Sequence, residues 1–347
     1  MMPEEWPIAP AAAERQAPAR AAGRGRLSTV HRDFFLDPAE RLTEQERALM
    51  TAMLHCLVGD IAAEIRAALP IGWASANDDE AAMIERLTRA GLLDDAQLVA
   101  LLLRRADEER IGVAARARSG RRDARALQAL VSHENGPISA AGMALILARG
   151  RRRDRFGQCL VGFNDLPLES ADGLVEAIAA CFRSDIAAVQ GAAVADSELS
   201  NATSRLLDKH DPARSIEALN GSLVALLDGS GALSDELFLA CAQEGEVAFL
   251  AEVLARRAAI PGDVAFDELL SGDAGKLAAL LQVAGISREV SAGLLAAIGD
   301  LLGIADPGAA ISVFDAMTPD KVQAAASWLR AGPSYRRALD MLGVLRG

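Results

Sequence analysis

The chain contains four sequence signals for the start of a helix. In each of them an acceptor side chain stands directly before a proline: Asp37-Pro38, Asp211-Pro212, Asp306-Pro307 and Thr318-Pro319. The acceptor can bind a free N–H of the first helical turn, and the proline has no N–H to lose there and a φ angle that is already helical. Three of the four pairs lie between residues 211 and 319. The pattern therefore predicts a series of short, separately started helices in the second half of the chain.

The residues between these signals favour helices as well. Hydrophobic residues make up 51% of the 347 residues and aromatic residues only 4%, with Ala and Leu dominant. Ala and Leu are strong helix formers, and the β-branched and aromatic residues that favour strands are scarce. We predict an all-α fold, with an N-terminal helical bundle followed by a HEAT-like α-solenoid of short helix pairs. The expected division is a disordered tail over 1–30, the bundle over 31–185 and the repeat region over 186–347.

The first half starts its helices by other means. Thr43 and Glu46 have capping-box spacing before a helix of about 25 residues that ends at Pro70. Asp94 with Gln97 is predicted to cap a helix that runs through Glu109. An arginine-rich stretch over 150–169 breaks the periodicity, so we expect a long loop there.

Farther along the chain, helices are expected near 186–208 and 212–228. A weak repeat of about 27 residues relates GEVAFLAEVL (245–254) to GDAGKLAALL (272–281). Stacked helix pairs of this kind build solenoids. Ordinary Ala/Leu bias could produce the same match, so both interpretations stay open.

Three stretches carry a resemblance to a known family: HRDFFL (31–36), RLTEQERALM (41–50) and RRRDRFGQ (151–158). They resemble an alphaproteobacterial family of helical proteins that is catalogued only as a domain of unknown function. The C-terminal portions of that family resemble HEAT-like repeats. The resemblance implies a bacterial helical-repeat protein, and it brings no catalytic residues.

The arginines are concentrated in one part of the chain. The formal net charge is −12, which argues against general binding to nucleic acid, yet 13 arginines face only six acidic residues between Arg104 and Arg155. The candidate partner-binding residues are the part of this stretch where arginines are most closely spaced, with the phenylalanine beside them, and a tryptophan in an expected loop. They are Arg149, Arg151, Arg152, Arg153, Arg155, Phe156 and Trp73. Guanidinium groups suit carboxylate and phosphate contacts, so the predicted partner is another protein, acidic or phosphorylated. The alternative is that these arginines pair within the chain or are simply solvated.

Sequence motifs for catalysis are missing. There is no GxxxxGK[ST], no GxGxxG after a strand and no GxSxG, and Cys56, Cys159, Cys181 and Cys241 form no CxxC motif. We therefore expect no enzyme, no cofactor and no metal. His55 is the one candidate phosphoacceptor, on a long amphipathic helix with Asp60 and Glu64 one or two turns away. The alternative for His55 is an ordinary half-buried histidine at the edge of the apolar stripe.

The function predicted first is a non-enzymatic protein–protein interaction or scaffold protein with a regulatory role in bacteria. The alternatives are a signalling component that uses His55, or an enzyme whose site is assembled from distant residues. The longest uncharged run, Asn135–Ala148, has 14 residues and is too short to span a bilayer, and the N-terminus lacks the apolar segment of a secretory signal. We expect a cytoplasmic protein with no membrane partner.

Overall fold

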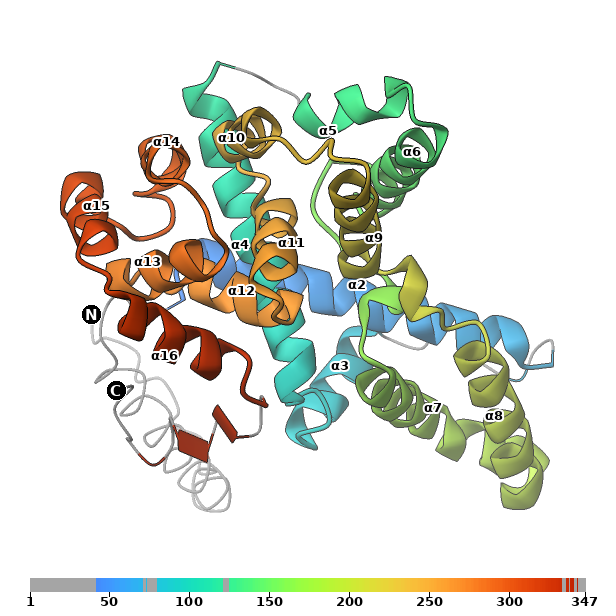
Figure 1. Cartoon of the computed structure of the whole chain (residues 1–347). Coiled ribbons are helices and arrows are strands. Elements are labelled where there is room, and N and C mark those ends of the chain that lie inside the picture. The colour runs from blue at the N-terminus through green and yellow to red at the C-terminus, as the bar shows by residue number, and fades with distance from the viewer. Residues whose placement is uncertain are drawn as a thin grey trace, which may run out of the picture. The chain divides into compact units, whose positions relative to one another are not determined.

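The fold is all-α in the computed structural model, which describes residues 42–70, 73, 80–120, 125–332, 335, 336, 338, 339 and 342. These ranges contain fifteen α-helices and no strand, and Figure 1 shows how the helices are arranged. Their bounds are α2 Glu44–Ala68, α3 Glu80–Arg89, α4 Ala96–Arg118, α5 Ala126–Ala129, α6 Gly136–Arg151, α7 Leu168–Gln190, α8 Ala192–Leu207, α9 Ile216–Gly229, α10 Asp235–Glu244, α11 Val247–Ala258, α12 Gly262–Leu269, α13 Ala274–Val283, α14 Arg288–Ile298, α15 Pro307–Asp315 and α16 Pro319–Leu329. Three 3-10 helices are η2 Leu130–Ser132, η3 Phe163–Asp165 and η4 Pro212–Arg214. The all-α prediction is confirmed.

The chain divides into two units, Met1–Arg47 and Ala48–Gly347. The described end of the first unit carries the predicted capping box, because the Thr43 N–H donates to the Glu46 carboxylate and the Glu46 N–H donates to the Thr43 hydroxyl. The tail over 1–30, the HRDFFL stretch and the Asp37-Pro38 signal lie outside the described residues. Everything that follows concerns the second unit.

Two of the predicted helix-start signals act as expected. Asp306 accepts from the N–H of Ala309 at 2.9 Å to start α15, and Thr318 accepts from the N–H of Lys321 to start α16. Asp211 instead starts only the 3-10 turn η4, and Ser215 caps α9 by accepting from Ala218. The prediction of a helix from 212 was therefore wrong by one turn, because Ser215 adopts an extended backbone that interrupts the helix.

Other predicted boundaries also shift. Asp95, not Asp94, caps α4, because Asp95 is extended and its carboxylate accepts from Gln97 and Leu98. α4 then continues past Glu109 to Arg118. The expected helix over 186–208 is two helices, α7 and α8, separated at Gly191, whose φ of 89° ends the first.

The buried apolar side chains form two clusters. One joins α2 and α3, the first half of α4, α7 and α8, and the other joins the second half of α4, α5, α6 and α9 to α16. α4 contributes Leu102 and Ala106 to the first and Ile111 and Ala115 to the second. The domain boundary expected at 185/186 falls inside α7 and stays a prediction, as does the HEAT-like order of the later helices.

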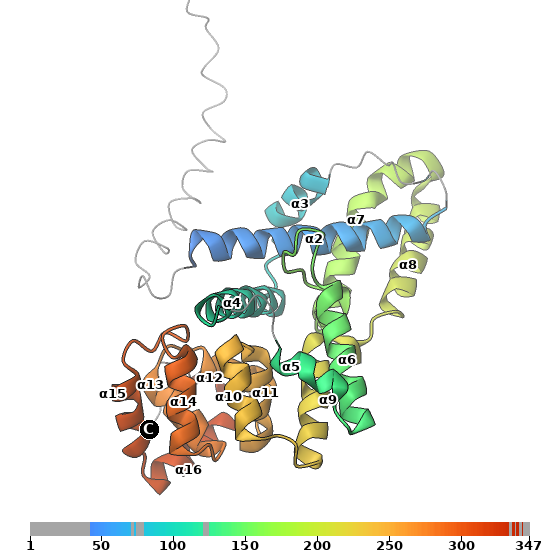
Figure 2. The same cartoon turned by 90° about the horizontal axis from the view of Figure 1, so that it is seen from above.

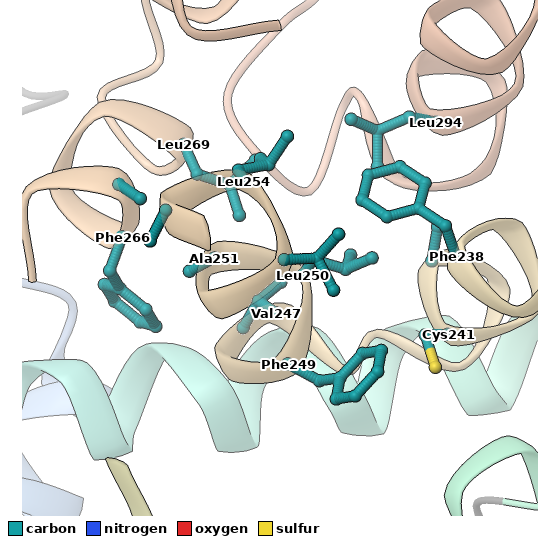
Figure 3. Close-up of a cluster of buried hydrophobic side chains, with 14 of the residues drawn as sticks. Phe238, Cys241, Val247, Phe249, Leu250, Ala251, Leu254, Phe266, Leu269 and Leu294 are labelled. Carbon is teal, nitrogen blue, oxygen red and sulfur yellow. The ribbon is translucent and has the colours of Figure 1, made fainter. Parts of the chain in front are cut away.

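The second cluster surrounds α11. Figure 3 shows Val247, Phe249, Leu250 and Leu254 of this helix directed to different neighbours, with Phe238 of α10 facing Leu294 of α14. α11 packs on α9, α10, α12, α13 and α4. A helix that is covered on so many sides must be apolar around most of its circumference. The sequence VAFLAEVLARRA meets that requirement apart from Glu252 and the final arginines.

α2 is long and apolar enough, by length and composition alone, to cross a membrane. Core helices can pass the same test, and α2 buries Met53, Leu57, Ile61 and Ile65 against other helices of its cluster. This burial accounts for the part of the apolar stripe that these four residues form.

The turn between α10 and α11 lies unusually close to α4. Gly245 has a φ of 71°, and a Cβ placed on it would lie 2.8 Å from the carbonyl oxygen of Ile111 and 2.9 Å from the Cα of Gly112. Both the backbone conformation and the contact therefore require glycine. This approach fixes the start of α11 against the middle of α4.

We expect Gly245→Ala to lower the free energy of unfolding by about 2–4 kcal/mol, since it adds steric overlap to backbone strain. Gly285→Ala is the matched control, because Gly285 has a φ of 65° but nothing near its Cβ position; it should cost only about 1–2 kcal/mol. Urea unfolding of both variants measures the difference. Equal losses would show that the close approach contributes nothing.

Candidate functional site

A cleft of about 390 Å³, lined by both charged and apolar groups, lies where α4 and α6 meet the loop over 152–162 and the starts of α9 and α11. Such a volume can admit a small ligand or the side chains of a partner. Five arginines and three glutamates line it: Arg105, Arg116, Arg149, Arg152, Arg153, Glu108, Glu109 and Glu246. Three of these arginines belong to the predicted partner-binding group.

The expected loop over 150–169 is shorter than predicted. α6 runs to Arg151, so Arg149 and Arg151 stand in its last turn, where a positive charge interacts favourably with the helix dipole. η3 and α7 then account for 163–165 and the residues from 168. The remaining loop still carries Arg152, Arg153 and Arg155.

Arg105 is the most buried charge in the cleft, with 3% of its side chain exposed. Its guanidinium donates to Glu108 at 2.6 Å and to both carboxylate oxygens of Glu217 at 2.7 and 2.8 Å. Two carboxylates around one buried guanidinium offset its desolvation. Burial raises the pKa of Glu108, against the lowering influence of the Arg105 charge.

Arg152 forms a second buried pair. It donates to Asp165 at 2.6 and 2.8 Å, and Asp165 also accepts from the N–H groups of Gly162 and Ile216. Burial alone would raise the pKa of Asp165, but the hydrogen bonds from Arg152 and the charge of Arg105 lower it. Asp165 therefore joins both ends of the loop over 152–162 to the first residue of α9 through one carboxylate.

Two further pairs close the wall of the cleft. Arg149 donates to Glu246 at 2.5 Å, and Arg153 donates to Glu109 at 2.7 and 3.2 Å. Arg149, Arg152 and Arg153 are thus all paired within the chain, as in the intramolecular alternative for the arginine-rich group. These three arginines hold the loop in place, and their positive charges are already neutralised by carboxylates of the same chain.

The tip of this loop is held rigidly. Arg153 and Cys159 form an antiparallel β-bridge, and the Asp154 carboxylate accepts from the N–H groups of Phe156 and Gln158 at 2.8 Å each. Arg153 also donates to the carbonyl of Gly157 at 2.6 Å. On the tip, Phe156 is 75% exposed and the Arg155 guanidinium lies 4.7 Å from the centre of its ring. An aromatic side chain and a cation are therefore presented together to solvent.

Arg116 differs from the other arginines of the cleft. It lies one turn after Gly112 on α4 and forms no ion pair or hydrogen bond with any residue in the part of the chain that the structure describes. Its charge is therefore available to an anionic group that enters the cleft.

Cys159 also lines the cleft, but its chemistry is unsuited to catalysis. Burial, followed by the charges of Glu108 and Glu109, raises the pKa of its thiol to about 11. The thiolate is the nucleophilic form, so this cysteine is protonated and unreactive at neutral pH. All four cysteines are free, and Cys56 is the exposed one.

The remaining sequence candidates lie elsewhere. Trp73 is half-buried and packs against the cluster of α2, α3 and α7, and His55 is exposed on α2. Glu64, one of the two acidic residues noted near His55, pairs with Lys209 at 3.1 Å. His55 as a phosphoacceptor stays a prediction. Within the described ranges no group of three or more His, Cys, Asp or Glu residues could hold a metal ion.

A smaller cavity of about 20 Å³, the size of one water molecule, adjoins the cleft behind Arg105. Asn220 of α9 is fully buried there, and neither polar atom of its amide has a partner in the described part of the chain. Glu252 of α11 lies against Gly262, where a Cβ would be only 2.3 Å from a carboxylate oxygen. Burial, then the charges of Glu217 and Asp263, raises the pKa of Glu252 to about 7.

Sequence reasoning missed Arg105, Arg116, Asp165 and Glu252. A signal existed for Arg105, which continues the buried positions Leu98, Leu101 and Leu102 of α4. A charged residue within an apolar stripe indicates a buried ion pair, although its partner Glu217 is 112 residues away. No local pattern marks Arg116 or Asp165.

Asp165→Asn should lower the free energy of unfolding by about 3–5 kcal/mol at pH 7, because it leaves the Arg152 guanidinium without its carboxylate. The lowered pKa of Asp165 means that this stabilisation is present above about pH 4 and is lost as the pH falls through the folded-state value. Asp196→Asn is the control, because its pair with Arg183 is exposed to solvent and should contribute little to stability. Similar losses in both variants would contradict the buried-pair interpretation.

Glu252→Gln should stabilise the protein above pH 7. The folded-state pKa of about 7 exceeds the ordinary value of 4.5, so between these values the folded state binds more protons than the unfolded state. At higher pH, ionisation of the buried Glu252 therefore lowers the free energy of unfolding. Thermal unfolding should show a gain on the order of 2 kcal/mol at pH 8 that shrinks as the pH falls and vanishes below about pH 4. Glu176→Gln, on the exposed side of α7, is the control for the substitution itself. A pH-independent effect at Glu252 would refute the raised pKa.

Comparison with known proteins gives one family. Residues 85–326, more than half of the chain, match the family described as an uncharacterised protein conserved in bacteria (DUF2336). The match spans α4 to most of α16 and so includes every helix that lines the cleft. No curated protein and no solved structure matches the chain. The predicted resemblance to a bacterial family of unknown function is confirmed, and its alphaproteobacterial and HEAT-like details stay predictions: this chain belongs to the DUF2336 family.

Proposed function

We propose that this protein is a non-enzymatic interaction or scaffold protein of bacterial regulation, acting in the cytoplasm. Its partner is an acidic segment of another protein, bound at the arginine-rich loop. The single observation that carries this proposal is the tip of that loop, where a fixed turn holds Phe156 and Arg155 outward.

The rigidity of the tip supports binding rather than chance exposure. Ordering a flexible loop costs free energy on association, and a loop already fixed by its own hydrogen bonds avoids that cost. Aromatic and arginine side chains are also the residues that most often dominate the binding energy of protein interfaces. Phe156 supplies the apolar anchor, and Arg155 supplies the charge.

The charge distribution supports an acidic partner. Glu109 and Asp165 neutralise Arg153 and Arg152 on the inward side of the loop, so the free positive charge of the loop lies at Arg155. Arg116 of α4 adds a second free charge within the cleft. The rest of the chain is strongly acidic. An acidic partner would thus be attracted to this region and repelled from most of the remaining surface.

The chemistry of the cleft gives little support to an enzyme. Its thiol is protonated at neutral pH, and most of its charged groups are held in ion pairs that leave no free base beside a nucleophile. The phosphoacceptor alternative rests on the exposure of His55 alone.

Photo-crosslinking tests the proposal. A benzophenone amino acid in place of Phe156, in the full chain expressed in its native cells, should give a discrete protein adduct whose crosslinked peptide is rich in Asp and Glu. The same group in place of Leu168, which is also exposed and apolar, is the matched control. Arg155→Glu should reduce the yield at position 156 by about 5-fold or more, since a favourable charge becomes repulsive.

The absence of an adduct at position 156, or equal adducts at 156 and 168, would refute a binding role for the tip. An adduct that Arg155→Glu leaves unchanged would contradict the acidic character of the partner.

A further inference from the structure

One face of α6 is apolar and exposed. The helix carries no charged residue from Gly136 to Ala148, and it buries Ile138, Gly142, Leu145 and Ala148. The opposite face consists of Ala140, Met143, Ala144, Leu147 and, at its end, Arg151, all exposed. Met143 is 43% exposed and Leu147 is 53% exposed.

This face is a straight stripe. Its residues recur at spacings of three and four, which places them within about one third of the helix circumference. The buried face packs on α9 and η2, and α6 lies beside α9 in Figure 2. A surface helix with one face in the core ordinarily carries polar residues on the other. α6 departs from that pattern over about three turns.

The stripe is complementary to itself in an antiparallel arrangement. If two copies of α6 pair about a two-fold axis between residues 143 and 144, Leu147 of one copy lies over Ala140 of the other. Met143 then lies over Ala144 of the other copy. Each large side chain meets a small one, which lets the two helices approach closely and fill the space between them.

The charges at the two ends of the stripe agree with the same arrangement. Glu134 precedes α6 and Arg151 ends it, and both are exposed without an ion pair in the described part of the chain. In the antiparallel pair Arg151 of one copy lies opposite Gly136 of the other, within reach of Glu134. A parallel pair would instead place like charges together at each end. An isologous interface therefore forms two equivalent ion pairs.

We propose that α6 is the interface of a homodimer, in which two copies of this chain pair antiparallel through Ala140, Met143, Ala144 and Leu147. One helix pair covers less than the 1,200–2,000 Å² or so of a stable interface, so the dimer dissociates on dilution. Each α6 is about 24 Å long and leads directly into the Arg155–Phe156 tip, so the two tips lie at opposite ends of the helix pair.

Sedimentation velocity of the full chain over a wide concentration range tests this. The wild type should change from monomer to dimer as concentration rises, and Met143→Glu with Leu147→Glu should raise the dissociation constant at least about 10-fold by burying charge in the interface. At concentrations where the wild type is monomeric, circular dichroism and the thermal midpoint should stay unchanged, because both side chains are exposed in the monomer. Val189→Glu is the matched control, since Val189 is 78% exposed on α7.

A charge exchange tests the antiparallel register. Glu134→Arg alone and Arg151→Glu alone should each weaken the dimer by about 3-fold or more, and the double variant should restore it to within about 2-fold. A chain that is monomeric at every concentration overturns the proposal and leaves this face to a different protein. A dimer that is insensitive to the Met143 and Leu147 changes also overturns it, and a double variant weaker than either single one overturns the register.

Discussion

The buried guanidinium of Arg105 is the interaction on which the arrangement of this molecule depends. It stands on α4 directly before Ala106, the last residue that this helix gives to one apolar cluster, and less than two turns before Ile111, the first that it gives to the other. A charge in that position requires carboxylates, which Glu108 supplies from the same helix and Glu217 from α9. The requirement fixes α9 against α4 more specifically than apolar packing does, since apolar side chains tolerate small shifts and a bidentate pair does not.

The same constraint creates the cleft. Holding α9 and α11 against the charged part of α4 leaves polar groups facing one another across the gap. Each resulting ion pair ties a different element to the wall: Arg152 to Asp165, Arg149 to Glu246 and Arg153 to Glu109. Most arginines of this surface are therefore paired with carboxylates of the same chain. What it offers to other molecules is confined to Arg116, Arg151 and the Arg155–Phe156 tip, a far smaller surface than the number of arginines indicates.

The two proposed interfaces are physically distinct but joined along the chain. The α6 face is apolar and self-complementary, whereas the tip that follows it is cationic and aromatic. A dimer formed through α6 would present two tips in opposite directions, so that a partner with two acidic segments would bind with an effective concentration set by that separation. Such an arrangement suits a scaffold better than a pocket for one small ligand.

The sequence by itself determined the helical class, because Ala/Leu content and the scarcity of strand formers are local properties. It also determined helix starts such as Thr43, Asp306 and Thr318, whose hydrogen bonds span three residues. Only the tertiary structure decided the partners of the arginines. Arg105 and Glu217 are 112 residues apart, and nothing in the spacing of either predicts that they meet. Packing likewise decided which face of α6 is exposed. Because α6 is apolar on both sides, its sequence indicates only that one side is buried, and the neighbouring helices determine which side that is.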